Sequence, residues 1–389
     1  MLKSLKEIMY HSFYENKSNE LIRKINIPNY YVFSEMLELF LELHAGSNTP
    51  EPHMITVLCV THAAYRVAIQ KGFNAIYLYD ILDFDDQDYQ PKVQIPTFGF
   101  AILESADTIS YALVKKLHEA MAPNTYFYIF YDNFIPRRYV PQEDIVALYG
   151  NCYDVTRVTS DRNVMNVVIR HFLNALRQRN NTLEQCLTKE SANIQKEEIT
   201  KFDLAYHLDL SKVIITPHIT LVKELNWKIR NYLGLVSNAD PCMPMQGEWM
   251  ITERAAEAVE VVSGKKHTLP IGYRFQVKEC LTTNNGSYTI TFDHELPTGE
   301  VVECNTFAAK RYIEYMAFGR SETPHPPFSY CINYAYVIPH FYSVNAEYED
   351  GVVLFDGRLS ADKKDFYTAV LPIKKNLQIY YNLHKRIDY

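Results

Sequence analysis

The fold of this chain is decided by the stretch Val57-Leu58-Cys59-Val60-Thr61-His62-Ala63-Ala64. A short apolar run that ends in a turn has the pattern of a buried strand. The chain turns at Thr-His and continues through two alanines. Strand-like and helix-like runs alternate from residue 22 to about residue 180. This alternation predicts a parallel sheet with covering helices.

Two later runs repeat the pattern and carry acidic residues at their ends. They are Gly99-Phe100-Ala101-Ile102-Leu103-Glu104-Ser105-Ala106-Asp107 and Tyr126-Phe127-Tyr128-Ile129-Phe130-Tyr131-Asp132-Asn133-Phe134-Ile135-Pro136. Taken alone, one acid at a strand end is most often a solvated cap. An apolar strand followed by a helix is common in α/β proteins, so one such run says little. The order and spacing of several runs are more informative than any single run.

In this order the runs resemble the conserved strands of superfamily 1 helicases of the Dda/RecD type. The resemblance implies a Gly-rich loop upstream, in which backbone N–H groups, a Lys and a Ser/Thr hold the phosphates and Mg²⁺. The matching residues 26–35 contain no glycine, Phe33 stands in place of the lysine, and Ser34 remains. The alternative, in which residues 22–45 form an ordinary strand, turn and helix, stays open.

The other catalytic positions implied by the resemblance are also altered. Glu104 and Ser105 replace the Asp-Glu pair that holds Mg²⁺ and polarises the attacking water. Asp132 is kept in the segment that senses the γ-phosphate, but Ile135 replaces its glutamine. Pro372 stands in place of the arginine finger, a group worth orders of magnitude in rate. We therefore expect no catalytic residues and interpret these positions as degenerate remnants.

Further matches lie in the second half of the chain. Residues 213–217 and 221–230 resemble the strand and helix that open the second RecA-like domain. Residues 334–343 resemble a segment that contacts DNA in the family, but its signature Thr, His, Lys and Gln are replaced. The resemblance leaves a weak set of nucleic-acid-binding candidates: Thr61, His62, His340, Phe341 and Tyr342.

We expect an α/β protein with two RecA-like parallel-sheet lobes and a small β-barrel-like insertion in the second. The first lobe, a degenerate P-loop domain, spans residues 1–180, and the second spans residues 211–389. Residues 181–210 are polar and are expected to form a linker. The insertion is expected at about residues 245–330, where apolar and polar residues alternate and Asn284-Asn285-Gly286 is a strong hairpin signal.

Composition limits the function classes. A chain of 389 residues should hold two domains or more, and its net charge of −7 disfavours broad attraction to phosphates. Seven scattered cysteines without a C-x-x-C motif indicate a reducing compartment, and neither they nor the histidines have metal-ligand spacing. The sequence contains no run of ~20 consecutive apolar residues, so we expect no membrane-spanning helix. We expect a cytoplasmic protein, in the host cytoplasm or the virion if the chain is phage-encoded.

Together these features predict a catalytically inactive helicase-like protein without a cofactor. We expect a structural or scaffolding subunit of a protein assembly, for example in phage replication, transcription or a virion, because close relatives of this type are often phage-encoded. Thirty tyrosines and twenty phenylalanines suit contact with a protein partner, whereas nucleic acid is expected to bind weakly. The alternatives are passive binding of single-stranded nucleic acid and, less favoured, an active ATP-dependent DNA helicase with divergent motifs.

Overall fold

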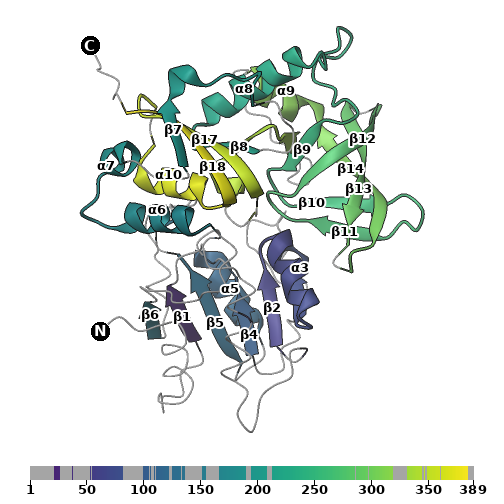
Figure 1. Cartoon of the computed structure of the whole chain (residues 1–389). Helices are drawn as coiled ribbons and strands as arrows, with labels where there is room; N and C mark the ends of the chain where they lie inside the picture. Colours follow the sequence, from purple (N-terminus) through teal and green to yellow (C-terminus); the bar gives the residue numbers. More distant parts are fainter. Residues whose placement is uncertain are drawn as a thin grey trace. The chain divides into compact units, whose positions relative to one another are not determined.

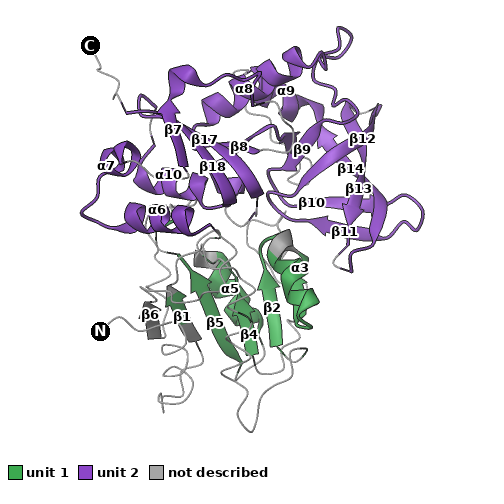
Figure 2. Ribbon diagram, in the orientation of Figure 1, with its two compact units in different colours: residues 1–164 green, residues 165–389 purple. Residues whose placement is uncertain are grey.

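The computed structural model divides the chain into two compact units, Met1–Val164 and Met165–Tyr389, which are distinguished by colour in Figure 2. The residues that it describes are 22–26, 37, 53, 55–81, 100–104, 106, 109, 111–121, 125–132, 134–135, 151–154, 166–189, 194–207, 213–284, 286–296, 298–318, 331–343, 346, 348–359 and 361–383.

A parallel sheet of six strands forms the first unit, in the order β3-β2-β4-β5-β1-β6 (Figure 1). Its strands are β1 (Ile22–Asn26), β2 (Ile55–Cys59), β3 (Asn74–Tyr77), β4 (Phe100–Leu103), β5 (Tyr126–Tyr131) and β6 (Asn151–Asp154). Its described helices are α3 (His62–Gln70), α4 (Leu78–Ile81) and α5 (Tyr111–Ala120).

The core of this unit lies between α5 and the central strands. Leu113 and Leu117 are four residues apart and therefore face the same side of α5. They form one buried cluster with Leu58 of β2, Leu103 of β4 and Ile129 of β5. The apolar runs are therefore buried strands, as the sequence predicted.

A second parallel sheet, of five strands in the order β16-β8-β17-β18-β7, lies in the second unit. Its strands are β7 (Ile194–Glu198), β8 (Val213–Thr216), β16 (Val337–Pro339), β17 (Tyr348–Asp356) and β18 (Ile373–Asn382). The associated helices are α6 (Val167–Arg177), α7 (Leu183–Thr188), α8 (Ile219–Tyr232), α10 (Lys363–Val370) and the 3₁₀ helices η5 (Ile199–Lys201) and η7 (His340–Tyr342).

An antiparallel sheet of seven strands completes the second unit, in the order β11-β10-β14-β13-β12-β9-β15 (Figure 1). Its strands are β9 (Trp249–Thr252), β10 (Ala256–Glu260), β11 (Lys266–Leu269), β12 (Arg274–Thr282), β13 (Ser287–Glu295), β14 (Val301–Ala309) and β15 (Ile332–Tyr334). Helix α9 (Lys310–Phe318) follows β14. The β-rich insertion and the two parallel sheets confirm the predicted α/β architecture.

The hairpin between β12 and β13 shows why the insertion was visible in the sequence. The two strands are antiparallel, and Gly286 between them has φ of +75°, which glycine adopts without strain. Along β13, Tyr288, Ile290 and Phe292 are buried, whereas the residues between them are partly exposed. A strand with one buried face has this period of two.

The predicted linker over residues 181–210 was wrong, because these residues contain α7, β7 and η5. Strand β7 pairs with β18 and forms an edge of the second parallel sheet. An edge strand tolerates charged residues. At the start of α7, Thr182 and Gln185 form a capping box in which each side chain accepts the other's backbone N–H. The second unit begins at Met165, earlier than the expected residue 211.

No helix in the described part of the chain is long and apolar enough to cross a membrane.

Candidate functional site

Three polar candidates follow neighbouring strands at one edge of the first sheet. Strands β2, β4 and β5 are adjacent and parallel, and Thr61, Glu104 and Asp132 come after their carboxyl ends. Ligands of open α/β sheets bind outside this edge. Phe33, Ser34 and Ser105 lie outside the described residues.

Glu104 is buried, and its carboxylate ties β4 to the turn after β2. Its Oε2 accepts the N–H of Val60 at 3.1 Å, and its own N–H donates to the carbonyl of Leu58 at 3.2 Å. A carboxylate taken out of water is costly unless it is hydrogen-bonded, and this contact supplies such a bond. The pKa of Cys59 is raised by its burial and by the nearby charge of Glu104.

Asp132 shapes the turn after β5. It is buried, its Oδ1 accepts the N–H of Phe134 at 2.9 Å, and its carbonyl accepts the N–H of Ile135 at 3.1 Å. Aspartate commonly closes turns in this way. Ile135 is also buried.

Thr61 is the N-cap of α3. Its hydroxyl oxygen accepts the N–H of Ala64 at 3.3 Å, a bond that satisfies one of the unpaired donors at a helix start. His62 is the first residue of α3, and its side chain is outside the described set. Thr61 therefore has a structural role that its sequence position did not reveal.

The equivalent edge of the second parallel sheet gathers two histidines and two aspartates. His218 follows β8, His340 follows β16 and Asp356 ends β17, and these three strands are neighbours. Nε2 of His340 lies 3.3 Å from Oδ1 of Asp365 in α10. Of these residues, only His340 was a candidate from the sequence. His218 and Asp356 could have been found from their positions at the ends of strands.

His218 is an acceptor of a backbone hydrogen bond. Its Nε2 accepts the N–H of Asp356 at 3.0 Å, so this nitrogen carries no proton. Burial lowers the pKa of His218 to about 4, although Asp356 and Asp365 act to raise it and His340 acts to lower it. Asp356 is bound by the guanidinium of Arg358, whose Nη2 lies 2.6 Å from Oδ2. These groups hold the strand ends together.

The aromatic candidates pack within the protein. Tyr342 is buried and its hydroxyl donates to Oε2 of Glu253 at 3.4 Å. The Phe341 ring is half-buried and lies edge-on to Tyr342, with ring centroids 4.5 Å apart. Glu253 also accepts hydrogen bonds from Asn333 and Tyr312. Tyr342 is therefore not exposed for stacking on a base.

Pro372 begins the connection to β18. Helix α10 ends at Val370 with Leu371 as its C-cap, so the proline lies outside the helix. It is buried, and its carbonyl accepts the N–H of Tyr348 at 2.9 Å. A proline at this position loses no helical hydrogen bond, because the helix has already ended.

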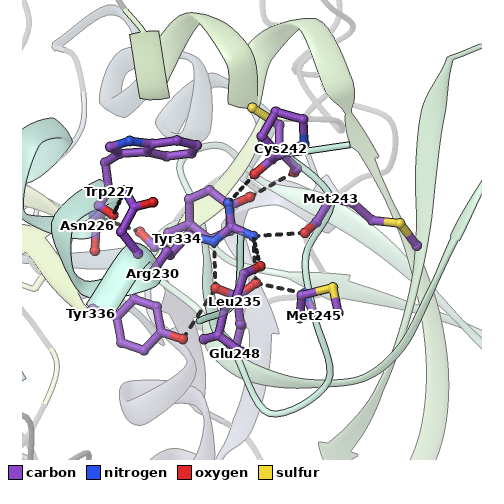
Figure 3. A network of polar contacts seen from close by, with 12 residues as sticks. Asn226, Trp227, Arg230, Leu235, Cys242, Met243, Met245, Glu248, Tyr334 and Tyr336 are labelled. Atoms are coloured by element: carbon purple, nitrogen blue, oxygen red, sulfur yellow. Dashed lines mark hydrogen bonds and ion pairs between the residues drawn. The ribbon is translucent and has the colours of Figure 1, made fainter. Parts of the chain in front are cut away.

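A buried polar network around Arg230 was not predicted from the sequence. Arg230 of α8 is fully buried and forms an ion pair with Glu248, as Figure 3 shows. Its guanidinium also donates to the carbonyls of Leu235, Pro241 and Met243. Arg230 thereby fixes the loop that runs from α8 to the antiparallel sheet.

Asn226 acts one turn earlier in α8. Its side-chain amide donates to the carbonyls of Tyr334 and Val337, and its Oδ1 accepts the N–H of Val337 at 2.8 Å. Asn226 therefore holds the start of β16, and Arg230 holds the loop that follows α8. Within the described residues, no group of three His, Cys, Asp or Glu side chains could hold a metal ion.

Two RecA-like parallel sheets with an antiparallel sheet attached to the second define a helicase-like fold. No protein-family profile matches the sequence, and no curated protein matches it. Among solved structures, Pif1 helicase from Bacteroides in complex with ADP-AlF3 and ssDNA is similar, with a TM-score of 0.50 and 11% identity, covering 98% of this chain and 92% of that chain. For Pif1 helicase from Candida albicans the TM-score is 0.47 and the identity 12%, covering 98% and 94%. Identities this low show the likeness of fold alone.

Proposed function

We propose that this chain is a catalytically inactive helicase-like protein that acts as a structural or scaffolding subunit of a protein assembly. A phage replication, transcription or virion assembly is the setting that we favour. In this role the two lobes are retained as a stable framework, and ATP is neither bound nor hydrolysed.

The bond between Glu104 and Val60 is the observation that carries the proposal. By the resemblance, Glu104 stands at the first position of the acidic pair that holds Mg²⁺, and its Oε2 accepts the backbone N–H of Val60 at 3.1 Å. A carboxylate used in this way stabilises the turn after β2. An acid that holds Mg²⁺ through water must instead turn its carboxylate toward the hydrated ion.

Pro372 supports the same proposal from the second lobe. Stabilisation of the transition state needs a cation at the finger position, and proline has none. Its carbonyl is used in the bond to Tyr348, and its ring is buried. The side chain of Pro372 itself has no group that could donate to a phosphate.

Two of the nucleic-acid-binding candidates in the second unit, His340 and Tyr342, favour a protein partner over nucleic acid, because they are buried. Tyr342 is buried and bonded to Glu253, and His340 is buried beside Asp365. Base stacking would contribute about 1–3 kcal/mol per base, but it needs an exposed ring. The net charge of −7 adds long-range repulsion of a phosphate backbone.

Isothermal titration calorimetry with ATP and Mg²⁺ tests the catalytic part of the proposal. We expect no saturable heat, whereas an active Pif1 helicase in the same buffer should bind. A saturable heat with micromolar affinity, or ATP hydrolysis stimulated by single-stranded DNA, would overturn it.

Fluorescence anisotropy with a labelled single-stranded oligonucleotide near physiological salt tests the role of nucleic acid. We expect weak, salt-sensitive binding or none. A nanomolar dissociation constant would favour the passive nucleic-acid-binding alternative. Purification of the native complex, with identification of the proteins that accompany the chain, then names the partner.

A further inference from the structure

Arg274 lies on an aromatic surface at the start of β12. Its Cζ lies 4.2 Å from the centroid of the Trp249 ring, and its Nε donates to the carbonyl of Ala335 at 3.1 Å. Strand β12 pairs with β9, so the stacked residues come from neighbouring strands. One of the five guanidinium N–H groups is therefore used, and the side chain is held in one orientation by stacking.

Within the described residues, the charge of Arg274 lacks the carboxylate partner that Arg230 and Arg358 have. Arg230 is paired with Glu248, and Arg358 with Asp356. Among the described residues, Arg274 contacts no carboxylate, and its Nη atoms have no acceptor. Burial lowers its pKa, and the groups that oppose this are the phenols of Tyr348 and Tyr336. A half-buried cation without an acid is unfavourable in the isolated protein.

We propose that Arg274, stacked on Trp249 and beside Tyr336 and Tyr348, binds the carboxylate of an acidic side chain on a protein partner. The two Nη atoms present parallel N–H groups, which match a carboxylate in a bidentate geometry. Binding would supply the missing counter-charge at a position that is already partly desolvated. This inference rests on the proposed scaffolding function and names the chemistry of its partner.

The surroundings of Arg274 favour a protein carboxylate over a nucleic-acid backbone. Arg, Trp and Tyr are the residue types that carry most of the energy in protein–protein interfaces. A nucleic-acid strand is instead bound by several cations that neutralise successive phosphates. The contacts of Arg274 within the described residues are to the Trp249 ring and the carbonyl of Ala335, and neither involves a second cation.

Trp249 provides the readout for a direct test. The chain has two tryptophans, so a Trp227→Phe background leaves Trp249 as the single indole, in contact with the proposed site. The protein is titrated with a capped tri-glutamate peptide, with a capped tri-glutamine peptide and with a short oligo(dT). We expect a saturable change in fluorescence with tri-glutamate in the millimolar range, and none with tri-glutamine.

Substitutions at Arg274 then test whether this side chain binds the peptide. Arg274→Gln should raise the dissociation constant for tri-glutamate at least about tenfold, because the charged fork is lost. Arg274→Lys keeps the charge but not the fork and should also weaken binding. Arg311→Gln, at an exposed arginine of α9, is the matched control and should leave the affinity unchanged. Thermal melting reports whether each variant is folded.

Three results would overturn the proposal: no saturable change with tri-glutamate, equal affinity in a folded Arg274→Gln variant, or oligo(dT) binding that is tighter than peptide binding and is lost with Arg274. If Arg274→Gln does not fold, unchanged affinity in Arg274→Lys overturns it instead. ATP calorimetry does not involve Arg274, so failure of this site and failure of the proposed loss of ATPase activity are distinguishable.

Discussion

The guanidinium of Arg230 and the carboxylate of Glu248 form an ion pair in which neither side chain is exposed to solvent. Nε lies 2.7 Å from Oε1, and Nη2 lies 3.1 Å from Oε2. The pair joins α8 to the entry of the antiparallel sheet, 18 residues later. Because burial of either charge alone is very unfavourable, each residue depends on the other for its stability in the folded state.

Removing one partner of this pair should strongly destabilise the second unit. We expect Glu248→Ala to lower the free energy of unfolding by about 3–5 kcal/mol, because it leaves a buried guanidinium without its counter-charge. Urea denaturation followed by circular dichroism measures the effect. Lys228→Ala is the control in the same helix: Lys228 and Glu224 form an exposed pair, worth about 0–1 kcal/mol. Similar losses in both variants would contradict this prediction.

Glu104 offers a test of its structural role in the first unit. Glu104→Gln keeps a side-chain oxygen that can accept the N–H of Val60, whereas Glu104→Ala does not. An unsatisfied buried donor costs about 1–3 kcal/mol, so we expect the alanine variant to be the less stable by that amount. Thermal melting compares the two. Equal melting temperatures would show that the contact with Val60 contributes nothing measurable.

Gly272 is expected to be intolerant of a side chain. Its φ is +80°, and an added Cβ would overlap the carbonyl oxygen of Tyr342. Gly264 has a similar φ of +70° with nothing within 4 Å of an added Cβ, so it is a matched control. Gly264→Ala should cost about 1 kcal/mol from backbone strain alone, and Gly272→Ala should cost clearly more. Chemical denaturation of the two variants decides this, and equal losses would show that no steric overlap exists.

The buried histidines should make stability fall in mild acid. Burial lowers the pKa of both His218 and His294 to about 4, below the ordinary value of 6.5. The unfolded chain therefore binds protons more readily, and stability that is present above about pH 6.5 is lost progressively as the pH falls toward 4. The loss is on the order of 3 kcal/mol for each histidine.

Urea denaturation at several pH values between these limits measures this dependence. His218→Gln and His294→Gln should each flatten the decline, since glutamine does not titrate. His171 of α6 is exposed, and His171→Gln should leave the slope unchanged. An equally steep decline in all three variants would show that other groups cause it.

Much of the fold could be predicted because its signals are local. The run around Leu58 becomes a buried strand, and the hairpin ending at Gly286 is found where the sequence placed it. Period-two alternation marks the antiparallel strands, since one face of each is buried. The linker was mistaken because an edge strand and a capped short helix have the polar composition of a linker, and only pairing with β18 distinguishes them.

The candidate site was less predictable, because sequence position names a residue without naming its contacts. Thr61, Glu104 and Asp132 were found as strand-end residues, but their hydrogen bonds to Ala64, Val60 and Phe134 were not. Two of these contacts are local caps or turns. The bond from Val60 to Glu104 spans 44 residues, so it exists only when the sheet has formed.

The sequence by itself determined the alternation of strands and helices and the antiparallel insertion. These follow from side-chain periodicity, which acts over a few neighbouring residues. The tertiary structure alone decided that Glu248 compensates Arg230 and that Arg274 lies on Trp249 without an acid among the described residues. The energy of a buried charge depends on which groups the fold brings within a few ångströms, and no local pattern encodes that distance.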